Sequence, residues 1–352
     1  MPKKAELGKR LALLKGRLRE KKLDALLVTR GVNISYLTGF AGHDATLIVT
    51  SGKSYFITDS RYIEEAGDSV KGFEVRLARR SLYEIIRDIA AAGKLRRIGF
   101  ESRDLPYEIA VRLKKVLGKS SFEPAGELIE ELRAVKDAGE IALIKDAIRL
   151  THGVLAKAKS FIKPGVSEES LAGKIEIEFL KTGARPSFEL IVAADAGSSK
   201  PHAIPTARKI KKDSYVMLDI GCMLRGYSSD LTRVFRVGGA RPGMEKIWKV
   251  VRDAQAKAIE LIRPGARIAD IDAAARQYIK GKGFGRYFGH ALGHGVGMEV
   301  HEKPNIAPMS EGRLVSGMIF TVEPAIYIPK TGGIRVEDMV LVTDRGCEVL
   351  SQ

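Results

Sequence analysis

The chain has 352 residues, of which 45% are hydrophobic and 29% charged, and a net charge of +16 at pH 7. This length exceeds one typical core and predicts two domains, and the composition argues against a disordered chain. No stretch approaches the roughly 18 apolar residues of a membrane span, and two cysteines are too few for a disulfide framework. The first residues predict an amphipathic helix, with Leu7, Leu11, Leu14 and Leu18 on one face, rather than a signal peptide. We therefore expect a cytoplasmic protein with no membrane partner.

The positive charge is unevenly distributed along the chain. Residues 1–126 carry 25 Lys and Arg against 15 Asp and Glu, and the remaining residues carry 34 against 28. Basic pairs such as Lys21-Lys22 and Arg79-Arg80 are scattered and lack the interleaved aromatic residues of a nucleic-acid-binding surface. We favour a solvated basic face, with nucleic-acid binding as the alternative.

Residues 1–126 are predicted to form a small α/β domain, because short apolar strands alternate with helical segments. The strands are expected at 25–29, 45–50, 54–58 and 97–100. The helices are expected at 81–92 and 106–117.

Residues 127–352 are predicted to form a second domain with a faint internal repeat. It begins with one long helix from Glu127 to about Phe161, which keeps its apolar period through Gly139. Ile162–Gly165 then recurs as Ile262–Gly265, and each Pro-Gly turn is followed by a helix, at 168–181 and 268–280. The same element order on both sides predicts duplicated halves that face each other across a cleft.

Four acidic residues interrupt apolar runs of this second domain that otherwise predict buried strands. They are Asp219, Asp230, Glu323 and Glu337. A charge in such a strand is costly without partners, and any one of these acids alone is best explained by a structural salt bridge. Four clustered carboxylates need more cations than Arg335 and Arg233 supply, so one or two divalent metals are expected to neutralise them. Asp219 and Asp230 are expected to lie opposite or diagonal to each other across a hairpin whose second strand runs over 227–237, and Arg335 and Glu337 to share one face of a strand.

Four of the six histidines lie at loop or glycine-rich positions of the second domain. They are His202, His290, His294 and His301. His294 lies in Gly293–Gly297, where glycines suit a close approach of the backbone to a ligand, and it is the best candidate metal ligand. We interpret His43 and His152 as structural or solvent-facing.

Six segments of the second domain contain the four acids described above, His294 and His301: Met217–Gly221, Tyr227–Arg233, Gly293–Gly297, His301–Pro304, Thr321–Pro324 and Gly333–Asp338. These segments resemble the pita-bread metallopeptidases, specifically the branch of prolidase and aminopeptidase P. In the first domain, Asn33–Phe40 and Ile57–Tyr62 are similar to the creatinase/prolidase N-terminal domain. The resemblance implies an α/β (α+β) fold, in which a small creatinase/prolidase-like domain precedes a pseudo-twofold pita-bread catalytic domain.

The resemblance implies a site for two divalent metal ions and no other cofactor. Asp219 would bind one metal and His294 and Glu323 the other, with Asp230 and Glu337 bridging both. Four carboxylates and one imidazole form a hard ligand set, which suits Mn²⁺ or Co²⁺ at least as well as Zn²⁺. Two such cations share a water molecule and supply hydroxide near neutral pH.

Further residues match family positions that act on the substrate. Glu323 would accept the proton of the attacking water and deliver it to the leaving nitrogen. His202 and His301 would donate hydrogen bonds to the developing oxyanion, and His290 would line the proline pocket. Arg335 would orient Asp219 or Glu337, and a purely structural ion pair is the alternative.

The expected substrates are short peptides with proline in the second position. A dipeptidase must capture the carboxylate of Xaa-Pro, and in some members an arginine follows the His-Glu-x-Pro segment, whereas Asn305 follows Pro304 here. The sequence therefore favours an Xaa-Pro aminopeptidase, with an Xaa-Pro dipeptidase (prolidase) as the alternative. A more distant alternative is a non-catalytic member of the fold that binds nucleic acid or protein. Relatives also lead us to expect a homodimer.

Overall fold

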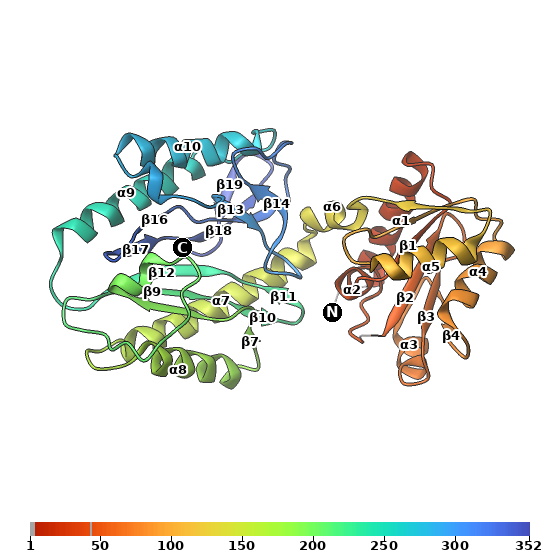
Figure 1. Cartoon of the computed structure of the whole chain (residues 1–352), viewed down its shortest axis with the longest axis horizontal. Coiled ribbons are helices and arrows are strands. Elements are labelled where there is room, and N and C mark those ends of the chain that lie inside the picture. The colour runs from red at the N-terminus through yellow and green to blue at the C-terminus, as the bar shows by residue number, and fades with distance from the viewer. Residues whose placement is uncertain (1–3, 43) are drawn as a thin grey trace. The chain divides into compact units, whose positions relative to one another are not determined.

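The computed structural model describes residues 4–42 and 44–352, so His43 lies outside the described residues. It divides into two compact units, residues 1–133 and residues 134–352 (Figure 1). Among the described residues, no helix is both long and apolar enough to cross a membrane.

The first unit is built on one mixed sheet. In the described part of this unit, the sheet has six strands in the order β4-β3-β2-β1-β5-β6. The strands are β1 (Ala25–Val28), β2 (Ala45–Thr50), β3 (Tyr55–Thr58), β4 (Glu74–Leu77), β5 (Arg97–Phe100) and β6 (Ser121–Pro124). The helices are α1 (Lys4–Glu20), α2 (Gly31–Thr38), α3 (Ile63–Ser69), α4 (Leu82–Ala92) and α5 (Tyr107–Leu117). The predicted α/β architecture is confirmed, and the elements that the sequence missed (α2, α3, β4 and β6) are short ones with weak periodicity.

The long helix predicted from Glu127 to Phe161 is wrong as a single element. It is split into α6 (Leu128–Ala134) and α7 (Ala138–Phe161). Between them, the amide of Lys136 donates to the carbonyl of Gly317 at 2.9 Å, as an extended strand would. A capping box then starts α7, because the side chain of Asp137 accepts from the amide of Glu140 and the carboxylate of Glu140 accepts from the amide of Asp137. The apolar period runs through the break, so periodicity alone could not reveal it.

Removing this cap is expected to destabilise the protein. Asp137→Ala leaves the first turn of α7 without its side-chain acceptor and is expected to lower the free energy of unfolding by about 0.5–2 kcal/mol. Asp137→Asn is the matched control, because asparagine caps helices about as well as aspartate. Urea denaturation followed by circular dichroism measures both. Equal losses in the two variants would contradict a capping role.

The second unit contains two helix pairs and several small sheets. Its remaining helical segments are α8 (Glu168–Lys181), η1 (Asp195–Ser199), α9 (Pro242–Ile259), α10 (Ile268–Gly281) and η2 (Gly285–Tyr287). The strands before α9 are β7 (Arg185–Pro186), β8 (Ile191–Ala194), β9 (Tyr215–Ile220), β10 (Cys222–Leu224), β11 (Tyr227–Ser228) and β12 (Leu231–Arg236). The strands after α10 are β13 (Gly293–Gly295), β14 (Glu302–Ile306), β15 (Ile319–Val322), β16 (Ala325–Ile328), β17 (Gly332–Arg335), β18 (Asp338–Val342) and β19 (Cys347–Val349).

The predicted duplication is confirmed by the order of these elements. Each half consists of a helix, a Pro-Gly turn, a second helix and then strands, and the turn glycines Gly165 and Gly265 both have positive φ, 91° and 82°. In Figure 1, α7 and α8 lie on one side of the strands of this unit, and α9 and α10 lie on the other. Strands of the two halves therefore face each other between the helix pairs.

The side chains of β9 point alternately into two hydrophobic cores, and this alternation directs the charge of Asp219 inward. Val216, Leu218 and Ile220 pack in the core formed with α7 and α8. Tyr215 and Met217 point the other way, into the core formed with α9 and α10. Because successive side chains of a strand alternate, Asp219 shares the face of Tyr215 and Met217. This carboxylate is thereby directed toward the interior between the two halves.

Candidate metal and catalytic site

Asp219 and Asp230 lie diagonally across an antiparallel pair, as expected. In the register of β9 and β12, Asp219 lies opposite Thr232, two residues beyond Asp230. The single strand predicted over 227–237 is wrong, however, because β11 and β12 belong to different sheets and are separated by Ser229 and Asp230. Asp230 therefore lies where the chain passes from one sheet to the next.

Glu323 and Glu337 occupy comparable junctions in the second half. Glu323 follows β15 and precedes β16, and Glu337 lies between β17 and β18, which belong to different sheets. The strand predicted through both Arg335 and Glu337 is thus broken at Val336 and Glu337. At such junctions the backbone leaves its ladder, so the side chain can turn into the space between the sheets.

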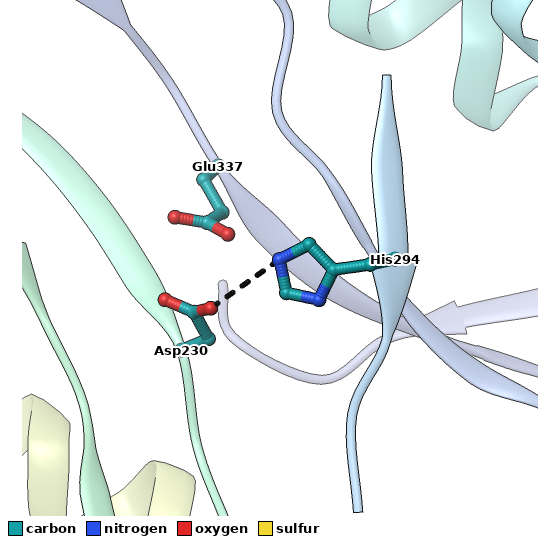
Figure 2. A group of neighbouring side chains, drawn as sticks. All are labelled: Asp230, His294 and Glu337. Atoms are coloured by element: carbon teal, nitrogen blue, oxygen red, sulfur yellow. Dashed lines mark ion pairs between the residues drawn. The ribbon is translucent and has the colours of Figure 1, made fainter. Parts of the chain in front are cut away.

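His294 lies on β13 and completes the cluster. Its Nε2 is 3.3 Å from Oε1 of Glu323 and 3.6 Å from Oδ2 of Asp230. Figure 2 shows His294 and Asp230 pointing toward each other with Glu337 beside them. One ligand atom from each of Asp230, His294 and Glu337 lies within 4.8 Å of the other two. Residues more than a hundred positions apart in sequence thus converge on one point.

Close packing of neighbouring strands requires the glycines on both sides of His294. A Cβ added to Gly293 would lie 1.9 Å from the carbonyl oxygen of Thr321 on β15, and one added to Gly295 would lie 2.0 Å from that of Lys303 on β14. No side chain fits at either position, because the neighbouring backbones approach too closely.

The carboxylates of this cluster are buried and repel one another. Burial, and then the charges of Glu337 and Asp219, raise the pKa of Asp230 well above its ordinary value. Burial and the charges of Glu323 and Asp219 do the same to the pKa of Glu337. Burial also raises the pKa of Asp219, against the opposing effect of Arg335. A cation among these three groups would remove much of this cost.

His294 and Glu323 are in contact and shift each other's pKa in opposite directions. Burial by itself would lower the pKa of His294, but the hydrogen bond and charge of Glu323 outweigh it and raise that pKa. Burial would raise the pKa of Glu323, but His294 and then Arg335 lower it. Thr321 holds both residues, since its hydroxyl accepts from the amide of His294 and donates to Oε1 of Glu323, both at 3.1 Å.

Arg335 is the arginine of this cluster, and each of its three guanidinium nitrogens donates a hydrogen bond. Its guanidinium pairs with Asp219, donates from Nε to the hydroxyl of Thr232 at 2.9 Å, and donates from Nη1 to the hydroxyl of Tyr327. Nη1 also reaches the carbonyl of Pro201 at 3.2 Å, next to His202. Thr232 in turn donates to Oε2 of Glu337 at 2.6 Å. Sequence reasoning missed Thr232, although it lies in the Asp230–Arg233 segment.

The other candidate histidines lie around the same cluster. The ring of His301 is 3.9 Å from that of His294, and partial burial and the charge of His294 lower its pKa. Burial lowers the pKa of His290, whose ring packs 5.7 Å from that of Tyr327. Both imidazoles are thus biased toward the neutral form. His152 lies elsewhere on α7, and burial lowers its pKa as well.

A cavity of about 460 Å³ opens over the cluster. All of the predicted site residues line it: His202, Asp219, Asp230, His290, His294, His301, Glu323, Arg335 and Glu337. The remaining wall is mostly apolar and includes Phe188, Leu190, Ile191, Pro201, Ile204 and Val300. An apolar cavity with a few converging polar groups is the usual form of a small-substrate site.

Comparisons with known proteins agree with this geometry. Residues 142–344 match the model of metallopeptidase family M24, and residues 10–135 match that of the creatinase/prolidase N-terminal domain. The chain belongs to metallopeptidase family M24. It is 32% identical to an Xaa-Pro dipeptidase of Pyrococcus horikoshii over 94% of this chain and 93% of that protein.

Solved structures of family M24 peptidases have the same fold. An Xaa-Pro dipeptidase from Bacillus anthracis superposes with a TM-score of 0.95 at 34% identity, with 98% of each chain covered. An X-Pro aminopeptidase from Thermotoga maritima superposes with a TM-score of 0.88 at 30% identity, with 96% of this chain and 97% of that chain covered. The predicted creatinase-like and pita-bread domains are therefore confirmed.

Membership of family M24 implies a divalent metal, and the residues present fit one. Oδ1 of Asp219 is buried with no hydrogen-bond partner among the described residues, while Oδ2 pairs with Arg335. The raised pKa values of Asp230 and Glu337 mark carboxylates that lack a compensating cation. Carboxylate oxygens and one imidazole nitrogen are suitable ligands for a hard or borderline divalent ion.

Proposed function

We propose that this chain is a metal-dependent Xaa-Pro dipeptidase, which hydrolyses the bond before proline in very short peptides. The observation that carries the proposal is the convergence of Asp230, His294 and Glu337 beneath an apolar cavity. The dipeptidases of Pyrococcus horikoshii and Bacillus anthracis support this substrate class over the aminopeptidase that the sequence favours.

The proposed metal site holds two divalent ions. Asp219, Asp230, His294, Glu323 and Glu337 are its proposed ligands, and Mn²⁺ or Co²⁺ suits them at least as well as Zn²⁺. When bound, such metals acidify a water molecule and polarise the substrate carbonyl. Arg335 and Thr232 hold Asp219 and Glu337 in orientation through the hydrogen bonds described above.

Glu323 is the proposed proton carrier of the reaction. A glutamate with its ordinary pKa of 4.5 is already ionised at neutral pH, so Glu323 can accept the proton of the attacking water. It then delivers that proton to the leaving nitrogen, which an amine needs because it is a poor leaving group. The hydroxyl of Thr321 fixes the orientation of the acid by donating to its Oε1.

The histidines are proposed to bind the reacting peptide unit. His301 and His202 would donate hydrogen bonds to the carbonyl oxygen as it gains negative charge. The bond before proline has no N–H, so recognition must rely on the shape of the ring rather than on a backbone donor. His290, packed between Phe288 and Tyr327, offers a flat wall for that ring.

An Xaa-Pro aminopeptidase is the second candidate, and one observation favours it. Among the described residues that line the cavity, Arg335 is the only Lys or Arg, and it is already paired with Asp219. Asn305 lines the cavity where some dipeptidases have an arginine. A dipeptidase therefore needs a cation from outside this cavity to bind the substrate carboxylate, and we propose that a partner subunit of a homodimer supplies it.

The two candidates differ in how they treat the carboxylate of Xaa-Pro. With Mn²⁺-loaded protein, we expect kcat/KM for Ala-Pro to exceed that for Ala-Pro-Ala-Ala at least tenfold. Ala-Pro-amide is the matched control, because it lacks only the charge; a lost charged hydrogen bond of about 1.5–3 kcal/mol corresponds to roughly 10- to 100-fold. Preferential cleavage of the tetrapeptide, with no penalty for the amide, would establish the aminopeptidase instead.

A further inference from the structure

Behind the cavity lie four connected residues, buried or half-buried: two donate hydrogen bonds to the carbonyls of Val336 and Glu337, and the other two hold these donors in place. They are Arg233, Gln255, Asp338 and Ser351, and we call them the carbonyl clamp. None of the four lines the cavity, within the part of the chain that the structure describes. They therefore cannot touch a substrate there, and their contacts are with the protein itself.

The clamp acts where the β-ladder is interrupted. Val336 and Glu337 belong to no strand, so their carbonyl groups have left the regular pairing of β17 and β18. Nη1 of Arg233 donates to the carbonyl of Glu337, and Nε2 of Gln255 donates to that of Val336 at 3.3 Å. Buried carbonyl groups require such donors. Side chains thus replace the missing strand partner around Glu337.

The same amide of Gln255 also reaches the second glutamate of the site. Its Nε2 lies 3.0 Å from the carbonyl of Val322, which precedes Glu323. It also lies 3.0 Å from Oδ2 of Asp338. Gln255 comes from α9 and is 7% exposed. One buried side chain therefore connects the backbone that carries Glu323 with the backbone that carries Glu337.

Ser351 secures the other side of the clamp. Its hydroxyl donates to Oδ1 of Asp338 at 2.8 Å, and its carbonyl accepts from Nη2 of Arg233 at 2.6 Å. Nη2 of Arg233 also pairs with Oδ1 of Asp338 at 2.7 Å. Each member thus restricts the rotamer of the next.

We propose that the carbonyl clamp is a set of positioning residues, which fixes Glu323 and Glu337 in the geometry that binds divalent metal. The inference rests on the proposed function, since it requires these glutamates to be ligands. Hydrogen-bonded groups behind metal ligands commonly contribute 10- to 100-fold to metal affinity. The clamp would do so through the backbone rather than through the ligand side chains.

The decisive variant is Gln255→Met, which keeps the length of the side chain and removes its donors. Titration of metal-free protein with Mn²⁺ by calorimetry is expected to show a dissociation constant about 10- to 100-fold higher than in the unchanged protein. Ser351→Ala tests the clamp from its other side and is expected to weaken Mn²⁺ binding in the same direction. If Gln255→Met does not fold, Ser351→Ala alone tests the proposal.

Glu178→Gln is the matched control, because it removes ion pairs with Lys157 and Lys181 from a buried acid of α8 outside the cavity. We expect this control to lose thermal stability without a change in Mn²⁺ affinity. Unchanged affinity in the clamp variants, with affinity lost in Glu337→Ala, would overturn the clamp alone. Unchanged affinity in Glu337→Ala would overturn the ligand assignment, and the role of the clamp with it.

Discussion

Removal of divalent metal with a chelator is expected to abolish peptide hydrolysis, and addition of Mn²⁺ or Co²⁺ to restore it. The physical reason is the cluster of buried acids, which Arg335 alone cannot neutralise. Hydrolysis of Ala-Pro by the chelated, desalted protein, before and after metal is returned, measures the effect. Substantial activity in protein whose metal content is below a few per cent by mass spectrometry would disprove the proposed mechanism.

The same chelated protein is expected to become less stable as pH rises. The pKa values of Asp219, Asp230 and Glu337 are raised in the folded state from ordinary values of 3.8 for aspartate and 4.5 for glutamate. A folded state that binds more protons than the unfolded state is stabilised at low pH. It loses this stability as pH rises through the raised pKa values of its acids. The raised pKa of His294 acts in the same direction.

The pKa of Glu323 is lowered in the folded state. This residue therefore adds stability as pH rises only in the range below its ordinary pKa of 4.5, and it opposes the trend only there. The lowered pKa values of His290, His301 and His152 also oppose the trend, because these groups add stability as pH rises to their ordinary value of 6.5. The melting temperature of metal-free protein is therefore expected to fall as pH rises above about 6.5, while that of Mn²⁺-loaded protein falls less. Differential scanning calorimetry of both forms over this range measures the difference. A gap between the two forms that stays constant with pH would show that the acids do not repel one another in the folded protein.

Glu323→Gln is expected to reduce kcat about 10²- to 10⁴-fold, the usual contribution of a general acid or base. The amide has nearly the same shape and keeps an oxygen that Thr321 can reach, but it cannot accept the proton of the attacking water. Steady-state kinetics of Ala-Pro hydrolysis at saturating Mn²⁺ measures the loss. The metal content of the variant, determined in parallel, separates the loss of the proton acceptor from the loss of the metal.

Glu178→Gln again serves as the control, because its carboxylate is buried outside the cavity. Its kcat is expected to stay within about twofold of the unchanged protein, as for a substitution away from the reacting atoms. Near-normal turnover by Glu323→Gln with full metal content would show that Glu323 is not the proton acceptor. The proton acceptor would then have to be sought among the other acids of the cluster.

The local sequence was sufficient to predict many of the regular elements and to single out the candidate ligands. Period-2 and period-3.6 patterns identified most of the longer elements, such as β2, α4, α8 and α10, because these patterns depend on neighbours a few residues away. The repeated Pro-Gly turns predicted the two halves for the same reason. Asp219, Asp230, Glu323 and Glu337 stood out because a charge within an apolar run needs a partner.

Only the tertiary structure decided where those elements end and what lies behind the ligands. Asp230 and Glu337 lie where the chain changes sheets, and such a change depends on which distant strand offers hydrogen bonds, so no local pattern reveals it. Gly293 and Gly295 accommodate the backbones of neighbouring strands, a requirement set by residues far along the chain. In the sequence, Gln255 is one of several polar residues on an amphipathic helix. Only the folded chain places it against the backbone that carries Glu323 and Glu337. The sequence therefore determined which residues could bind metal, and the packing of the two halves determined that they meet.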